Sequence, residues 1–479
     1  MRMGFWALLM GAAALLNAHA YAAGRAADVA AHWTSERRAQ ATPRDLVIDE
    51  RGRGYLRLPN GQLSPYGHGI AGLNIDTRAK PPGEDTNPTK ITDMDPADGD
   101  AIGDSYTFSA NVADRDGIKS VSFVIEDPED VARSFGPTLD GEDTWKLGLE
   151  GLTDGEWRWW VVVKDLGPRG GTTTTSPAVG FTVDTGGTPP DPEDTVADAE
   201  WIDGGLVQLY AGRLYFEMPA NKVWNRWNGY VCSGTVAFDE TTGRSVIITA
   251  AHCVYDDASK AFARNVLFIP DQADTLGDGT DLNCDNDPYG CWVPSFGVVD
   301  VEWTTRTFPD NIAWDYAYYV VSDEGAHVGD VEVDDALDAL GGDGGGMIVS
   351  FEAPSVDDSD PGAGSMDFTY ALGYSYSWDP QLRYSAEDMT TEGDVNWWLP
   401  SSELSGGSSG GPWVQPMDVE YGDGPIISVN SWGYTSGPGM AGPILYDTSA
   451  ECVFSASKTT AFSGVIAADG LAGVAVTCD

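Results

Sequence analysis

Two short motifs constrain the fold of this 479-residue chain more than any other feature of its sequence. Residues 249–253 read Thr-Ala-Ala-His-Cys, and residues 407–412 read Gly-Ser-Ser-Gly-Gly-Pro. A serine hydroxyl is a weak nucleophile unless an imidazole accepts its proton, and neighbouring glycines let two backbone N–H groups point at a developing oxyanion. We therefore interpret Ser409 as a nucleophile and His252 as its base, with the N–H groups of Gly407 and Ser409 as oxyanion donors. Taken alone, His252 is more simply a structural histidine at a strand end.

The order of these motifs and of two further segments resembles the chymotrypsin/trypsin family of serine endopeptidases, over roughly residues 198–479. Residues 314–320, Trp-Asp-Tyr-Ala-Tyr-Tyr-Val, are similar to the family's aspartate and the buried strand that follows it. The resemblance makes Asp315 the carboxylate that orients His252 and stabilises its imidazolium form. Without the resemblance, Asp315 is a strand-end carboxylate in an acidic chain.

The fourth segment resembles the strand on which the family binds the substrate backbone by antiparallel pairing, and it consists of Ser431, Trp432 and Gly433. The resemblance implies an all-β fold with two six-stranded antiparallel barrels and a cleft between them that holds the triad. It also implies the reaction, in which Ser409 attacks a peptide carbonyl, His252 transfers the proton and an acyl-enzyme forms. A zymogen precursor is expected as well.

Two departures from the family's pattern lie beside the nucleophile. Most relatives carry Asp directly before the serine, where it pairs with the ammonium group released by propeptide cleavage, whereas this chain carries Ser408. The cysteine that often precedes the motif is also missing, since Ser401 and Ser402 stand in that neighbourhood. These departures put activation by the ion pair in doubt and predict that one disulfide bond around the specificity pocket is absent.

The chain has six cysteines, an even number. In an exported chain this predicts disulfide bonds rather than metal ligands. The expected pairs are Cys232 with Cys253 from the resemblance, Cys284 with Cys291 from their closeness in sequence and, by elimination, Cys452 with Cys478.

The expected substrate preference depends on Glu403, six residues before the nucleophile. The trypsin-like branch of the family carries an acidic residue there, at the base of its pocket, so the resemblance predicts a preference for Lys or Arg. The alternative is that Glu403 points to solvent. Glutamyl endopeptidases of the same fold often carry His directly before the Ser-Trp-Gly strand, and Asn430 in that position argues against a preference for Glu.

The beginning of the chain predicts export. An arginine precedes an apolar stretch and small residues suited to cleavage, so we interpret residues 1–22 as a signal peptide. No later apolar run is long enough for a membrane helix, which predicts secretion to the extracellular space or the periplasm. Residues 23–88 are interpreted as a propeptide or a flexible N-terminal segment. Within them, Arg37 and Arg38 are either a processing site or a solvated pair, and we favour the solvated pair.

Residues 89–185 contain short stretches in which apolar and polar residues alternate, separated by turn signals. This pattern predicts a small antiparallel β-sandwich. It resembles a bacterial immunoglobulin-like or fibronectin type III-like module that lacks the inter-sheet disulfide. Trp157, Trp159 and Trp160 are either core residues or a platform for a carbohydrate or peptide, and we expect core residues. The Pro-rich, acidic residues 186–197 are interpreted as a linker.

The formal net charge of −47 limits the partners of the chain. Nucleic acid and anionic membrane surfaces would be repelled, so we expect neither; we expect a monomer that acts on polypeptides. Five aspartates crowd a Gly-rich loop and form either a solvated surface or a calcium site: Asp274, Asp278, Asp281, Asp285 and Asp287. We favour the solvated surface and expect no cofactor.

A second hypothesis comes from another class of protein. In it the chain is an extracellular binding or adhesion protein, whose sandwich module carries the function and whose protease-like domain is inactive. The intact set of His252, Asp315 and Ser409, with its glycines, favours the enzyme. A ligand for the sandwich module is left open.

Overall fold

The computed structural model divides the chain into two compact units: unit 1 is formed by residues 1–69 and 193–479, and unit 2 by residues 70–192. The expected signal peptide and most of the expected linker lie outside the described residues. The structure describes residues 24–49, 51–67, 89–97, 100–102, 106–113, 118–126, 128, 132–135, 137–139, 144–149, 152, 155–165, 173–183, 195–277, 283–331, 333, 336–340, 345–356, 367–393, 395–462 and 472–478.

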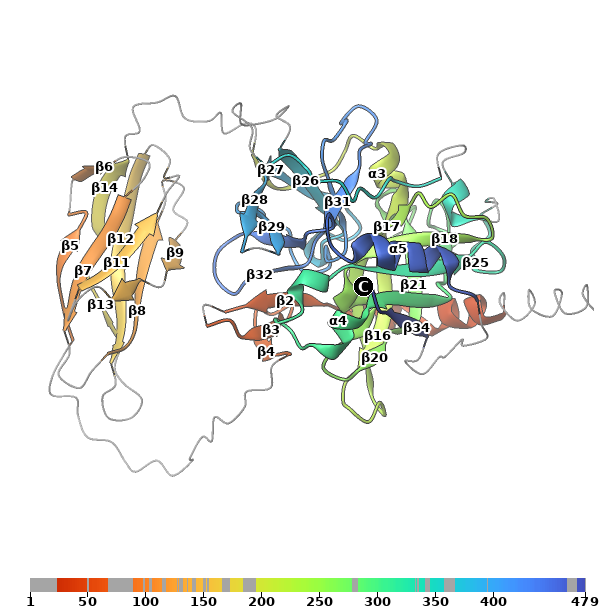
Figure 1. Ribbon diagram of the computed structural model, residues 1–479, viewed down its shortest axis with the longest axis horizontal. Helices are drawn as coiled ribbons and strands as arrows, with labels where there is room; N and C mark the ends of the chain where they lie inside the picture. The colour runs from red at the N-terminus through yellow and green to blue at the C-terminus, as the bar shows by residue number, and fades with distance from the viewer. Residues whose placement is uncertain are drawn as a thin grey trace, which may run out of the picture. The chain divides into compact units, whose positions relative to one another are not determined.

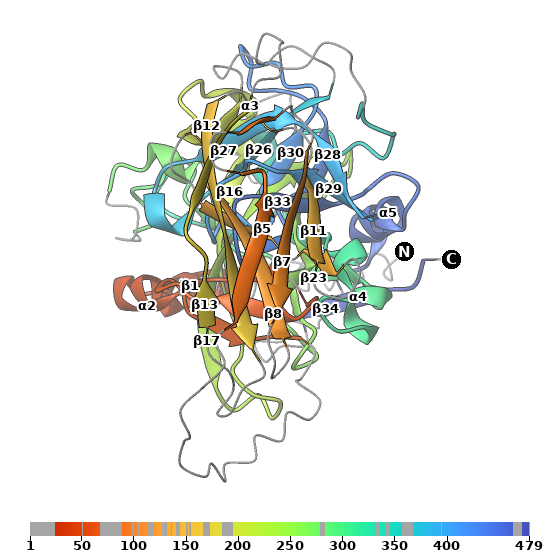
Figure 2. The same ribbon diagram turned by 90° about the vertical axis from the view of Figure 1, so that its left-hand side faces the viewer.

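Unit 2 consists of two sheets, and Figure 2 shows β5, β7 and β11 of the first side by side. In the described residues the first sheet contains β10 (Thr138–Leu139), β11 (Thr144–Leu149), β7 (Tyr106–Ala113) and β5 (Lys90–Asp95) in that order. The second contains β6 (Asp100–Ile102), β14 (Val179–Val183), β12 (Gly155–Asp165), β8 (Ile118–Glu126) and β9 (Ala132–Phe135), with β13 (Thr173–Thr175) beside β12.

The alternating residues of unit 2 bury one face of each sheet, as period-two patterning requires. Phe108, Phe123 and Trp159 meet edge to face in this core. Trp157 and Trp159 are buried and Trp160 is half-buried, so packing, rather than an exposed platform, accounts for the first two.

Unit 1 is also built from strands (Figure 1). Its largest sheet, as far as the chain is described, has ten strands: β25 (His327–Val328), β22 (Cys291–Trp292), β21 (Arg264–Pro270), β16 (Ala211–Pro219), β17 (Trp227–Ala237), β18 (Arg244–Thr249), β24 (Ala317–Ser322), β23 (Phe296–Asp300) and β34 (Gly473–Val476), with β1 (Thr42–Pro43) beside β17. The centre of this sheet is buried on both faces, which explains the continuous apolar run of β18.

Two further sheets of unit 1 contain five and seven of the described strands. One contains β15 (Val196–Glu200), β27 (Arg383–Asp388), β26 (Phe368–Gly373), β30 (Pro412–Val414) and β31 (Ile426–Val429). The other contains β28 (Thr390–Glu392), β29 (Asn396–Leu399), β33 (Met440–Pro443), β32 (Trp432–Tyr434), β2 (Asp45–Ile48), β3 (Gly54–Arg57) and β4 (Leu63–Pro65). The all-β class is thereby confirmed, whereas this pairing does not by itself show two six-stranded barrels.

Helices are short and few in the described residues of unit 1. They are α2 (Ser35–Gln40), α3 (Gly205–Tyr210), α4 (Val301–Thr305) and α5 (Ala450–Thr459), with residues 24–32 also helical. No helix in this part of the chain is long and apolar enough to cross a membrane. The three expected disulfides are confirmed: Cys232–Cys253, Cys284–Cys291 and Cys452–Cys478.

The N-terminal residues 24–67 are a folded part of unit 1, so a flexible segment was the wrong alternative for them. Figure 1 shows β2, β3 and β4, in red, beside β32. Trp33, Leu46 and Val47 are buried against the rest of the unit. Their apolar side chains are too few and too widely spaced to produce a periodic pattern, which is why the sequence did not predict this packing.

Candidate active site

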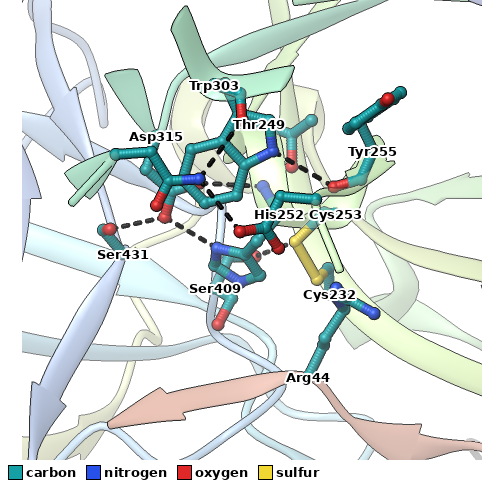
Figure 3. Close-up of polar contacts among 12 residues, drawn as sticks. Arg44, Cys232, Thr249, His252, Cys253, Tyr255, Trp303, Asp315, Ser409 and Ser431 are labelled. Carbon is teal, nitrogen blue, oxygen red and sulfur yellow. Dashed lines mark hydrogen bonds and ion pairs between the residues drawn. A yellow bond between two sulfur atoms is a disulfide. The ribbon is translucent and has the colours of Figure 1, made fainter. Parts of the chain in front are cut away.

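Strand pairing brings His252 and Asp315 together. His252 follows β18 and Asp315 precedes β24, and these two strands pair with Thr249 opposite Ala317. Nδ1 of His252 lies 2.7 Å from Oδ2 of Asp315, and the backbone N–H of His252 donates to Oδ1 at 2.8 Å (Figure 3). Both side chains are almost completely buried. The carboxylate therefore contacts His252 at both its backbone and its ring, with Nδ1 turned toward it and Nε2 turned away.

The side chain of Ser431 is a further member of this group. Its hydroxyl donates to Oδ2 of Asp315 at 2.5 Å (Figure 3). The resemblance predicts for Ser431 only a place on the substrate-binding strand. No local pattern could have indicated this contact, because it joins residues 116 positions apart.

Ser409 lies next to the turn that carries His252, with its backbone carbonyl 3.9 Å from Sγ of Cys253 (Figure 3). Its backbone carbonyl accepts the N–H of Ser233 at 2.7 Å, which anchors the Ser409 loop to β17. Gly410 has a φ of +81°, and a Cβ there would lie 2.1 Å from Oγ1 of Thr249, so only glycine fits. Nε2 of His252 makes no hydrogen bond within the part of the chain that the structure describes, so it remains available as a base.

The two expected oxyanion donors are unused. No hydrogen bond from the N–H of Gly407 or Ser409 is found among the described residues. The carbonyl of Gly407 accepts from Oγ of Ser233 at 2.9 Å, which holds the peptide groups of the loop in place. Two buried N–H groups beside a nucleophile are the arrangement that stabilises a tetrahedral oxyanion.

Asn430 is fully buried and makes hydrogen bonds to the loop that carries Ser409. Its Nδ2 donates to the carbonyls of Leu372 at 2.7 Å and Ser408 at 3.0 Å, and its Oδ1 accepts from Nε1 of Trp413 at 2.8 Å. Its carbonyl also accepts the N–H of Gly410. The sequence position of Asn430 predicts only the lack of a preference for Glu, and none of these hydrogen bonds.

The hydroxyl of Ser408 has a hydrogen-bond partner nearby in the sequence: it donates to the carbonyl of Ser405 at 2.8 Å. Oγ of Ser233 and Nδ2 of Asn430 fix the loop by neutral hydrogen bonds to the carbonyls of Gly407 and Ser408. The loop therefore has its supports without the buried ion pair that the family's aspartate would make.

The expected preference for Lys or Arg required the Glu403 carboxylate to lie at the base of a pocket, and it does not. The side chain of Glu403 is exposed, and its backbone N–H donates to the carbonyl of Ala197. A carboxylate in water exerts little selective attraction on a substrate cation because solvent screens it. The solvent-facing alternative is thus the correct one for Glu403. Trp432 and Gly433 lie in β32, directly after Ser431, whose hydroxyl contacts Asp315.

Within the same region, Glu387 on β27 is buried and accepts the N–H of Ser401 at 2.8 Å. Burial raises its pKa from 4.5 to about 7, although the hydrogen bond from Ser401 opposes this rise. The folded protein therefore keeps this proton at a pH where the unfolded chain has lost it.

Glu387→Gln should change the pH dependence of stability. Because the folded pKa is raised, the wild-type chain should lose stability as pH increases from 4.5 to about 7, by about 3 kcal/mol. The variant keeps an acceptor for Ser401 but cannot ionise, so it should be more stable than wild type at pH 8 and similar at pH 4. Urea unfolding at both pH values measures this difference, and a pH-independent difference would contradict it.

The acidic loop does not assemble a cation site from its described members. Among the described residues, the one group of side chains close enough to share a metal is Cys232, His252 and Cys253, in which the two cysteines form a disulfide. Asp274, Asp285 and Asp287 therefore do not converge. Asp278 and Asp281 lie outside the described residues.

Comparisons with known proteins leave the family open. No family model matches the chain, and no curated protein matches it. Among solved structures, the endo-β-1,4-mannanase from Thermotoga petrophila matches at 20% identity and a TM-score of 0.18, over 21% of each chain. CopC from Methylosinus trichosporium OB3b matches at 18% identity and a TM-score of 0.17, over 20% of this chain and 93% of CopC. The fibronectin(III)-like modules of Clostridium thermocellum CbhA match at 19% identity and a TM-score of 0.16, over 20% of this chain and 97% of theirs.

Proposed function

We propose that this protein is a secreted serine endopeptidase that resembles chymotrypsin and trypsin in mechanism. The observation that carries the proposal is one buried arrangement: the Asp315 carboxylate on Nδ1 of His252, an Nε2 without a hydrogen bond in the described residues, and Ser409 next to Cys253 with two unused N–H donors. Each part has a role in acyl transfer, and a purely structural histidine would not require the others.

In the proposed reaction, Nε2 of His252 accepts the proton of Ser409 as Oγ attacks the scissile carbonyl. The N–H groups of Gly407 and Ser409 donate to the resulting oxyanion. His252 then protonates the leaving amine, and water hydrolyses the acyl-enzyme by the same steps in reverse order. Asp315 stays ionised throughout and stabilises the imidazolium, while Ser431 orients the carboxylate.

The proposal extends to the architecture of unit 1. Six consecutive strands of the ten-stranded sheet, β21, β16, β17, β18, β24 and β23, correspond to the barrel that carries His252 and Asp315. The second barrel comprises β26, β27, β29, β30, β31 and β33, and the loop before β30 carries Ser409. The proposal includes no preference for Lys or Arg, since Glu403 is exposed. Three disulfides support secretion.

Covalent labelling with a fluorophosphonate tests the reaction class. The probe phosphonylates an activated serine, so we expect labelling at Ser409 and complete loss of it in Ser409→Ala. Ser408→Ala is the matched control, because its hydroxyl bonds only to Ser405 in the described structure, and it should still be labelled. The binding-protein hypothesis predicts no labelling of any form of the chain.

A further inference from the structure

β32, the strand expected to bind the substrate backbone, is already paired with a strand of the N-terminal segment. β2 lies parallel to β32, with Leu46, Val47 and Ile48 opposite Trp432, Gly433 and Tyr434. The residues of β2 are buried or nearly so. The N-terminal segment therefore occupies the edge at which a substrate backbone would bind under the proposed function.

The segment reaches this edge by passing along the loop that leads to Ser409. Upstream of β2, Thr42 and Pro43 pair in parallel with Tyr230 and Val231 of β17, the strand that also carries Ser233. The chain thus runs from the ten-stranded sheet to the seven-stranded sheet. Midway it contacts the nucleophile loop: a Cβ on Gly406 would lie 2.7 Å from Cβ of Asp45.

Asp45 is the acidic residue of the segment at this contact. Burial raises the pKa of its carboxyl to about 6, while Arg57 opposes this rise. Nη1 of Arg57 lies 3.7 Å from Oδ2 of Asp45.

The direction of the segment is opposite to that expected of a substrate. A substrate strand would lie antiparallel to residues 431–433, and β2 lies parallel to them. When a strand runs in the reverse direction, its peptide carbonyls and N–H groups point differently relative to a fixed nucleophile and fixed N–H donors. The segment can therefore fill the substrate site without presenting a peptide bond in the orientation that Ser409 attacks.

Specific anchors hold the segment in place. Arg44 is fully buried, and its Nη1 lies 3.3 Å from Oδ2 of Asp256. Its Nη2 donates to the hydroxyl of Tyr66 in the same segment, and that hydroxyl donates to Oδ1 of Asp257 outside it. Its guanidinium also lies over the rings of Tyr66 and Tyr230. Farther away, Nε1 of Trp33 donates to the carbonyl of Asn265 at 2.6 Å.

Charge favours the same docking. Residues 24–67 contain seven Arg against five Asp and Glu, whereas the whole chain has a net charge of −47. A net basic segment on a strongly acidic body is attracted electrostatically.

We propose that residues 24–67 are an autoinhibitory segment that binds across the active site in the reverse chain direction, and that activity requires its release. The inference rests on the proposed function. The segment inhibits by occupying the substrate site. His252, Asp315 and Ser431 are already in contact while the segment is bound, and the two oxyanion donors make no hydrogen bond in the described residues. Release therefore requires no rebuilding of the catalytic group.

A cleavable full-length chain tests the proposal. A recognition sequence for an unrelated, sequence-specific protease is inserted between residues 67 and 89. The rate of fluorophosphonate labelling at Ser409 and the turnover of a peptide library are measured before the cut and after the cut chain is separated from the segment by gel filtration. We expect both rates to rise at least 100-fold on separation. Near-ultraviolet circular dichroism reports whether the remaining chain stays folded.

A second variant weakens the docking of β2 without removing the segment. Leu46→Ala in the uncut chain removes a buried side chain that faces the core of unit 1, which weakens docking. Because labelling requires the open form, its rate should rise at least tenfold. Leu63→Ala is the matched control: the same change in the same segment, at an exposed residue of β4, should leave the rate unchanged.

The outcomes separate the two proposals. If Ser409 is labelled equally fast in the uncut chain, in Leu46→Ala and after separation, the segment is not inhibitory and only this inference fails. If no form is labelled, including the folded, separated chain, the proposed function fails. If the separated chain unfolds, the Leu46→Ala rate decides, and a rate equal to that of Leu63→Ala would overturn autoinhibition.

Discussion

His252→Ala should lower kcat/KM of the released enzyme by about 10⁴- to 10⁶-fold. Without the imidazole no group removes the proton of Ser409, and the remaining acceleration comes only from substrate binding and the two N–H donors. His252 lies in a short 3-10 turn after β18, and its ring contacts Asp315, so we expect the sheets to remain intact.

Peptide turnover under single-turnover and steady-state conditions measures this loss. His327→Ala is the matched control, because His327 packs over the ring of Trp292 on the far strands of the same sheet and should be dispensable for turnover. Turnover of His252→Ala within tenfold of wild type would remove the imidazole from the mechanism.

Asn430→Leu should both destabilise unit 1 and slow catalysis. The change leaves the carbonyls of Leu372 and Ser408 and the indole N–H of Trp413 buried without this partner. Each orphaned group costs about 1–3 kcal/mol, so we expect a loss of about 3–5 kcal/mol in unfolding free energy. The freed loop should also lower kcat by about 100-fold, because the oxyanion donors lose their alignment.

The ratio of the kinetic constants distinguishes positioning from a general loss of structure. If Asn430 positions the loop, kcat should fall while KM changes little, in samples shown to be folded by circular dichroism. Asn225→Ala, at an exposed residue of the loop before β17, is the control and should change neither stability nor rate. A stable Asn430→Leu variant with wild-type kcat would show that Asn430 has no positioning role.

The residues of the candidate site could be chosen from local sequence. The interpretation of Ser409 and His252 depended on glycines and an imidazole within two short motifs, and Asp315 followed from the order of the segments. In the structure Asp315 contacts Nδ1 of His252, and the carbonyl of Ser409 lies 3.9 Å from Sγ of the adjacent Cys253. The alternating strands of unit 2 were predictable for the same reason, because period-two burial is a property of each strand by itself.

Side-chain exposure was less predictable. Glu403 was placed in a pocket by counting residues back from Ser409, yet its side chain is exposed. Counting residues gives a position along the chain, whereas the direction of a side chain depends on what the backbone packs against. The folding of residues 24–67 illustrates the same limit, since their helices and strands bury apolar groups only because a complementary surface exists elsewhere.

The sequence by itself determined which groups could perform the chemistry, which cysteines could pair and which stretches form strands, since these properties depend on residue types and short spacings. The tertiary structure alone decided that Ser431 contacts Asp315, that Asn430 supports the nucleophile loop and that β2 lies parallel on β32. Those contacts join residues far apart along the chain. Their register and direction depend on how whole sheets pack, which no local pattern encodes.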